Sequence, residues 1–129
     1  MGEIVKVAVD AMGGDFAPAE PVKGAVDAVN ENHDIYIYLI GPQETVNHEL
    51  NKYNYAKDRI EVVNATEIIE TGEPPVKAIR TKKDSSLVKA MNMVRHQEAD
   101  ALVSAGSSGA ILVGGQVIVG RIKGVKRPP

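Results

Sequence analysis

The chain has 129 residues and no cysteine, so it can form one modest hydrophobic core but not two full domains, and it can form neither disulfides nor a cysteine metal site. The net charge of −2 hides an asymmetry, because residues 1–75 hold five basic and fourteen acidic side chains whereas residues 76–129 hold ten and three. The basic half predicts an anionic partner, and with one Phe, four Tyr and no Trp to stack on bases, a phosphorylated small molecule or an acidic protein fits better than nucleic acid.

The first half of the chain predicts three strands separated by two helices. Residues 4–9, 35–40 and 60–63 are short runs rich in β-branched or aromatic residues, which are typical of strands. A helix is expected from Pro18 or Pro21 to about residue 30, because Pro fits a first helical turn and apolar residues follow at helical spacing. A second helix is expected over residues 43–53, and residues 64–75 predict a loop.

The second half predicts two helices around one strand. Asp84 is expected to cap a helix that ends near residue 98, because its carboxylate can accept the free amide hydrogens of the first turn. Residues 101–104 predict a strand. Residues 110–119 predict a buried apolar helix whose Gly114 and Gly115 touch another helix, across a dimer or in a region missing from this chain. This alternation predicts one α/β domain over residues 1–129, with helices on both faces of a mostly parallel sheet.

The sequence predicts neither a targeting segment nor a metal site. No basic start followed by an apolar stretch and a cleavage site is present, and the apolar run at 110–122 is shorter than the roughly 20 residues of a membrane span. His33, His48 and His96 are too scattered to indicate a metal cluster. We therefore expect a cytoplasmic protein without a metal. The chain stops directly after a basic turn, which is typical of a truncated chain.

A glycine-rich loop follows the first predicted strand. Residues 10–15 read DAMGGD, and here Gly13 and Gly14 permit positive φ or a close approach of ligand to backbone beside Asp10. Ligands of open α/β sheets bind outside the carboxyl ends of the strands, where such loops lie. Taken alone, however, the loop fits a simple strand-to-helix turn better. Its spacing matches neither the dinucleotide fingerprint nor a P-loop, so no NAD, ATP or other cofactor is expected.

Two further loops offer donors for an anion. Residues 104–109, SAGSSG, connect a strand to a helix and can form an oxyanion cradle, although a serine cap on a flexible turn explains them equally well. Residues 80–86, RTKKDSS, place cations before a helix start, although charge runs are usually solvated. No catalytic acid, base or nucleophile can be assigned. The three loops together predict one phosphate site, with the candidate residues Asp10, Gly13, Gly14, Lys82, Lys83, Ser85, Ser86, Ser104, Gly106, Ser107, Ser108 and Gly109.

These loops, in this order, resemble the acyl-carrier-protein:phosphate acyltransferases of bacterial phospholipid synthesis. The resemblance covers the whole chain and rests on VDAMGGDFAP at 9–18, on EP at 73–74, AIR at 78–80 and KKDSS at 82–86, and on the closing segments 104–110 and 120–128. The family usually has Asn-Thr where this chain has Ser107 and Ser108, so the hydroxyl at 108 is kept and the amide is lost. The family's enzymes are also far longer, which implies that this chain is their N-terminal part.

The resemblance implies transfer of a fatty acyl group from the thioester of acyl carrier protein to inorganic phosphate. It also implies a three-layer α/β/α fold like that of phosphotransacetylases and isocitrate-type dehydrogenases, and a homodimer. A membrane-bound glycerol-3-phosphate acyltransferase is the implied partner, which leaves peripheral attachment to the membrane open.

The acidic carrier protein is expected to meet a basic cluster near the end of the chain, because opposite charges steer encounter. Cations at the end of a helix are also favoured by the helix dipole alone. The cluster consists of Arg121, Lys123, Lys126 and Arg127. Two other functions stay open: a phosphotransacetylase-like enzyme that uses acyl-CoA, and a lobe that binds phosphate or a partner without catalysis.

Overall fold

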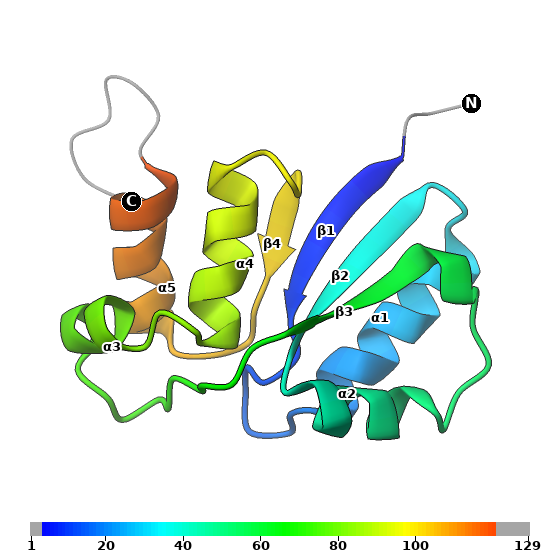
Figure 1. The fold of residues 1–129 in the computed structure, drawn as a ribbon, viewed down its shortest axis with the longest axis horizontal. Coiled ribbons are helices and arrows are strands. Elements are labelled where there is room, and N and C mark those ends of the chain that lie inside the picture. Colours follow the sequence, from blue (N-terminus) through cyan, green and yellow to red (C-terminus); the bar gives the residue numbers. More distant parts are fainter. Residues whose placement is uncertain (1–3, 121–129) are drawn as a thin grey trace.

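Four parallel strands form one sheet in the computed structural model, which describes residues 4–120. The sheet has the order β3-β2-β1-β4 (Figure 1). Each strand begins and ends within one residue of its predicted bounds, so the four sequence-predicted strands are confirmed. The strands are β1 (Val5–Asp10), β2 (Ile35–Gly41), β3 (Ile60–Asn64) and β4 (Ala101–Val103).

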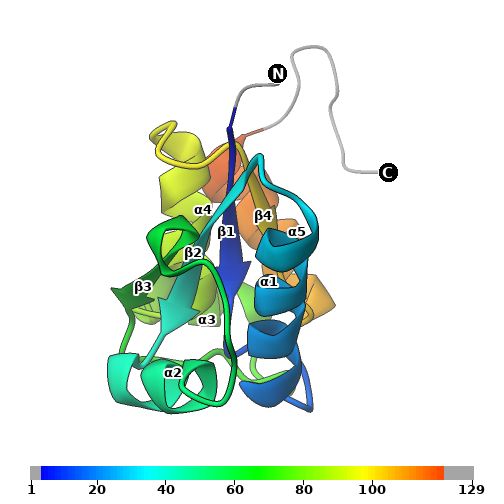
Figure 2. The same cartoon turned by 90° about the vertical axis from the view of Figure 1, so that its right-hand side faces the viewer.

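Side chains that alternate along the strands build a core on each face of the sheet. Val9 and Leu39 pack against α1 (Ala19–Glu31) and α2 (Gln43–Leu50), whereas Ala8 and Ile40 lie on the opposite face, in the core that includes Ala90 of α4 (Ser86–Arg95). This alternation follows from the two-residue period of a strand. Figure 2 shows α1 and α4 on opposite sides of β1. The three-layer α/β fold with a parallel sheet is therefore confirmed.

The start of α4 differs from the prediction. Ser85, not Asp84, is the N-cap, because Ser85 Oγ accepts a hydrogen bond of 3.2 Å from the amide of Val88. The carboxylate of Asp84 instead accepts hydrogen bonds from the amide and hydroxyl of Thr66 and pairs with Lys89. The expected cap was therefore wrong by one residue, since Asp84 serves to fix the segment that follows β3.

Three helices have bounds that the sequence did not give. A short helix α3 (Pro75–Thr81) lies where no helix was expected, and α2 and α4 each end three residues before their predicted ends. In addition, residues Lys57–Arg59 form a 3₁₀ turn before β3. The guanidinium of Arg59 donates hydrogen bonds to three backbone carbonyls around the connection from α1 to β2, those of Val29, Asn32 and Ile35.

The last predicted helix begins two residues earlier than expected and changes from an α-helix to a π-helix along its length. It consists of α5 (Ser108–Gly114) and a π-helical stretch (Gly115–Val119). A Cβ on Gly114 would lie 2.2 Å from Sδ of Met91 in α4, whereas a Cβ on Gly115 would meet nothing within 4 Å. Gly114 therefore packs closely against α4 of the same chain, rather than across a dimer or in a missing region as expected, and a contact of Gly115 with a partner helix stays a prediction. Over residues 4–120, no helix is long and apolar enough to cross a membrane.

Candidate functional site

The candidate site lies beside β1, where the order in which the chain adds strands to the sheet changes direction. The chain proceeds from β1 to β2 and β3 on one side of β1, and then returns to β4 on the other side. The loops that leave β1 and β4 therefore diverge toward opposite faces, and open α/β sheets bind ligands in the crevice that this reversal creates outside the carboxyl ends of the strands. In Figure 1 these loops form part of the lower edge of the molecule. They are the glycine-rich loop and the 104–109 loop that the sequence singled out.

The two loops are in direct contact through Gly13. A Cβ at this position would lie 2.9 Å from Asp10 Oδ2, from Ser104 Oγ and from the amide nitrogen of Gly106. No side chain fits there, so Gly is required for the close approach of the two backbones. The next residue, Gly14, has a φ of +92°, which residues with a side chain rarely adopt.

The carboxylate of Asp10 is the centre of this arrangement. Asp10 is only 4% exposed, and it accepts hydrogen bonds from Ser86 Oγ at 2.5 Å, from Ser104 Oγ at 2.8 Å and from the amide of Met12 at 3.1 Å. Ser104 Oγ in turn accepts a bond of 3.1 Å from the amide of Gly106. A buried carboxylate needs such donors because burial without them is costly. One side chain therefore joins β1, the start of α4 and the loop after β4.

Two of the candidate serines are helix caps. Ser85 caps α4, and Ser107 caps α5 by accepting a hydrogen bond of 3.2 Å from the amide of Ala110. Both residues are buried. By contrast Ser108 is exposed, and a Cβ on Gly109 would lie 2.7 Å from Cγ of Pro75. The start of α5 therefore packs on the start of α3, with the hydroxyl of Ser108 available to a ligand.

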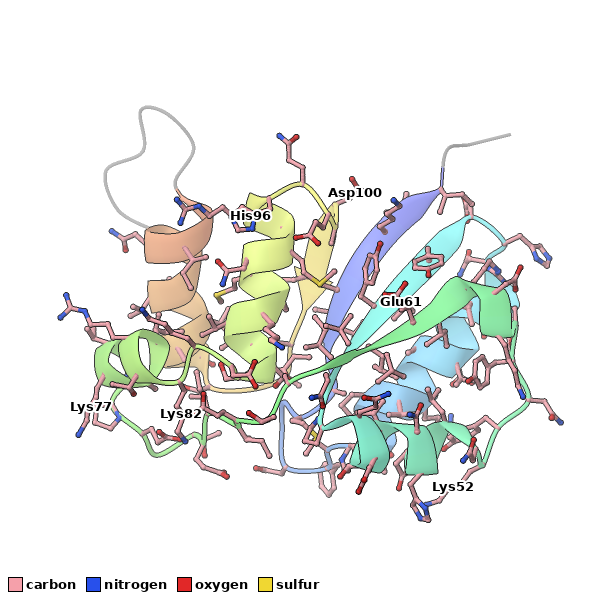
Figure 3. All side chains as sticks on the ribbon, viewed as in Figure 1. Lys52, Glu61, Lys77, Lys82, His96 and Asp100 are labelled. Carbon is pink, nitrogen blue, oxygen red and sulfur yellow. The ribbon has the colours of Figure 1, made fainter. Side chains whose placement is uncertain are left out.

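The two candidate lysines have different surroundings. The ammonium of Lys82 lies 2.7 Å from Glu73 Oε2 and 2.7 Å from the carbonyl of Ile68. This bond from Lys82, followed by a bond from the amide of Glu70, lowers the pKa of Glu73. Lys82 therefore stabilises the long connection before α3, below which it is labelled in Figure 3, whereas Lys83 is exposed.

The structure thus divides the sequence-predicted residues into three groups. Six form one contact network at the reversal of the sheet: Asp10, Gly13, Gly14, Ser86, Ser104 and Gly106. Ser107, Ser108 and Gly109 lie at the start of α5, and Lys82, Lys83 and Ser85 lie between α3 and α4. The basic cluster of Arg121, Lys123, Lys126 and Arg127 falls outside the described residues. Within residues 4–120, no three acidic or histidine side chains gather as metal ligands would.

The sequence did not indicate two residues at this edge of the sheet. Pro75 contacts the start of α5, and Thr66 binds the carboxylate of Asp84 from a position 18 residues earlier in the chain. Thr66 carries no sequence signal of its own. Pro75 fits a first helical turn, but a Pro is equally common in turns, so it does not by itself indicate α3.

The fold defines a class of protein: a parallel α/β unit of the kind found in phosphotransacetylases. A phosphotransacetylase from Streptococcus pyogenes superposes with a TM-score of 0.64 over 98% of this chain and 41% of its own, at 16% identity. Such low identity establishes the fold alone. Residues 5–129 match the family described as fatty acid synthesis protein, and the chain belongs to this family.

Two relatives of higher sequence identity are named phosphate acyltransferase. The chain is 53% identical to a phosphate acyltransferase of Clostridium tetani, and 51% identical to one of Clostridium botulinum, over 124 residues in each case. These matches cover 96% of this chain and 37% of each relative. The chain therefore spans little more than a third of the length of these relatives.

Proposed function

We propose that this chain is the N-terminal part of an enzyme that transfers a fatty acyl group from acyl carrier protein to inorganic phosphate. The observation that carries the proposal is the identity of 53% to a protein named phosphate acyltransferase, over nearly the whole chain. The position of the glycine-rich loop and the 104–109 loop at the reversal of the sheet supports it, since this is where such folds bind ligands. The family description, fatty acid synthesis, agrees with an acyl substrate.

The proposed reaction needs no nucleophile from the protein, because phosphate itself is the nucleophile and the protein has to position it. An oxygen of phosphate attacks the thioester carbonyl carbon, the bond between carbon and sulfur breaks, and the thiol of the carrier leaves with a proton while acyl phosphate forms. The protein must hold phosphate close to the carbonyl and stabilise the developing oxyanion. In our proposal the phosphate lies outside β1 and β4, against the backbone of the two loops, and the exposed candidates Ser108 and Lys83 contribute side-chain donors.

The remaining parts of the proposal concern the surroundings of the enzyme. We expect a cytoplasmic homodimer that receives its substrate from acyl carrier protein and passes acyl phosphate to a membrane-bound glycerol-3-phosphate acyltransferase. Attachment to the membrane surface would be peripheral. The basic cluster after residue 120 stays the predicted contact for the acidic carrier.

A chimera tests the proposal. The 129 residues are joined to the remaining C-terminal part of the Clostridium tetani relative, which the chain matches at 53% identity. The chimera and the chain alone are assayed for acyl phosphate with acyl carrier protein or acyl-CoA as donor. Acyl phosphate formation by the chimera from the carrier-bound substrate supports the proposal.

Two other outcomes correspond to the competing functions. A clear preference for acyl-CoA would favour a phosphotransacetylase-like enzyme, which the shared fold suggests. Phosphate binding without turnover in either protein would favour a non-catalytic lobe, which the coverage of only 37% of the relatives suggests. Either result would contradict the proposed reaction.

A further inference from the structure

The carboxylate of Asp10 presents a physical problem for a phosphate site. Two negative charges repel each other, so a carboxylate among the ligands of a phosphate would weaken binding. In the structure, however, Asp10 is 4% exposed and its oxygens accept hydrogen bonds from protein groups. Asp10 is therefore enclosed by the loops and is not open to a ligand.

We infer that Asp10 is a positioning residue, which holds the phosphate-binding loops in register through Ser86 and Ser104. This inference rests on the proposed function. It differs from the sequence-based expectation, in which Asp10 itself was a candidate ligand. The residue touches no substrate and acts through the loops that it joins.

Two of the hydrogen-bond partners of Asp10 are distant from it in sequence. Ser86 is 76 residues away from Asp10 and begins α4, and Ser104 is 94 residues away and follows β4. The third donor, the amide of Met12, belongs to the glycine-rich loop itself. Each of the three loops that the sequence predicted to converge thus donates one hydrogen bond to the same carboxylate.

The network continues from Ser104 to the backbone of the 104–109 loop. Ser104 Oγ donates to Asp10 and accepts from the amide of Gly106, and that amide nitrogen lies 2.9 Å from the place of a Cβ on Gly13. A shift of Ser104 would therefore move the 104–109 loop relative to the glycine-rich loop. Because a misplacement of about 1 Å can cost on the order of a hundredfold in rate, this register matters for the placement of phosphate.

The variant Asp10→Asn tests the inference in the chimera. Asn keeps the shape and one acceptor oxygen but replaces the other oxygen by an NH₂ group, so at least one serine loses its acceptor. We expect kcat/KM for phosphate to fall by roughly 10- to 100-fold, while KM for acyl carrier protein changes by less than about twofold. Isothermal titration with inorganic phosphate should show weaker binding in the same variant.

The matched control is Asp100→Asn. Asp100 accepts a hydrogen bond of 2.9 Å from the amide of Lys6, at the opposite end of β1, as Figure 3 shows. It resembles Asp10 in anchoring β1 through its carboxylate but lies far from the crevice. Its kinetics and phosphate titration should match those of the unmodified chimera.

Should Asp10→Asn fail to fold, Ser104→Ala removes a single donor and leaves Asp10 in place. It should raise KM for phosphate in the same direction by a smaller factor. Ser86→Ala does the same from the side of α4.

Three results would overturn the inference. Unchanged phosphate kinetics in Asp10→Asn would mean that the register does not depend on this residue. A lower KM for phosphate would mean that its charge acts directly on the anion. Equal losses for both substrates, in proportion to lost stability, would mean that Asp10 serves folding alone.

The proposed function is tested separately by the unmodified chimera. If the chimera forms no acyl phosphate but binds phosphate, the proposed reaction fails while the titration still decides the role of Asp10. If it neither reacts nor binds phosphate, there is no anion site for Asp10 to position, and the inference fails as well.

Discussion

The neighbouring glycines of the last helix offer a sharp test of how α5 packs. A Cβ on Gly114 would lie 2.2 Å from Sδ and 2.8 Å from Cε of Met91, a side chain that is fully buried. A Cβ on Gly115 would meet nothing within 4 Å, and the backbone there is helical, with a φ of −59°. The variants Gly114→Ala and Gly115→Ala therefore make the same chemical change in two different surroundings.

The expected magnitudes follow from two opposing effects. Replacing Gly by Ala within a helix stabilises by about 1 kcal/mol, and this gain applies to both positions. Forcing a methyl group into a filled core costs about 1–3 kcal/mol, and this cost applies only at 114. Gly115→Ala should thus raise the free energy of unfolding, whereas Gly114→Ala should leave it unchanged or lower it by up to about 2 kcal/mol.

Thermal unfolding followed by circular dichroism measures the difference. For a domain of this size, 1 kcal/mol corresponds to about 3–5 °C in Tm, so the two variants should differ by roughly 3–15 °C, with Gly114→Ala the less stable. In a background of Met91→Ala, which removes the obstructing atoms, the difference should largely vanish. A Tm of Gly114→Ala equal to or above that of Gly115→Ala in the unmodified background would refute the packing of α5 against Met91.

Two further predictions concern the stability of the fold. Arg59→Lys should lower the free energy of unfolding in urea by about 1–3 kcal/mol, because an ammonium cannot replace a planar guanidinium that serves three carbonyls; Arg95→Lys, on the exposed end of α4, should have no such effect. Hydrogen bonds from Lys89 and then Thr66 hold the pKa of Asp84 well below its ordinary value, so this carboxylate stabilises the fold above its unfolded pKa of about 3.9, and that stability is lost progressively as the pH falls below it. The gap in Tm between the unmodified chain and Asp84→Asn should therefore shrink from pH 6 to pH 3, and a constant gap would contradict this assignment.

The strands could be predicted from sequence because their signal is local. β1, β2 and β3 are short runs rich in β-branched or aromatic residues, and β4 is a short apolar run; a buried parallel strand needs little more than this. The helices α1 and α4 have regular apolar spacing, which also lies within a single segment. Long-range contacts were not needed to recognise any of these elements.

The helix α3 could not be predicted because its stability comes from elsewhere in the chain. It has seven residues, of which only Ala78 and Ile79 are buried, and so short a helix is marginal without tertiary packing. Its partner is α5, which begins 27 residues after Thr81. The cap of α4 is a similar case, since Asp84 and Ser85 are both suitable caps. What distinguishes them is the contact of Asp84 with Thr66, which the sequence does not reveal.

The loops of the candidate site were predictable as a set, but the task of each residue was not. The rule that ligands bind at the carboxyl ends of parallel strands locates a loop without stating which atoms face the ligand. Gly13 and Ser104 follow different strands, and their contact depends on the pairing of β1 with β4. Ser85 and Ser107 carry hydroxyls that suit an anion, yet the first turns of their own helices bind these hydroxyls.

At this edge of the sheet, the charged residues that hold the loops in place differ from those that could bind a phosphate. A phosphate needs positive charge or amide hydrogens around it, and the lysines between α3 and α4 and within α4 are not equally free to supply this charge. Lys82 is paired with Glu73, and Lys89 with Asp84, so their charges are already partly compensated. Lys83 and the loop amides then carry the larger share of anion recognition in our proposal, while the buried carboxylate of Asp10 determines where those amides lie. Because the chain spans 37% of the length of the Clostridium tetani relative, the remaining part of that relative can supply further cations in the chimera.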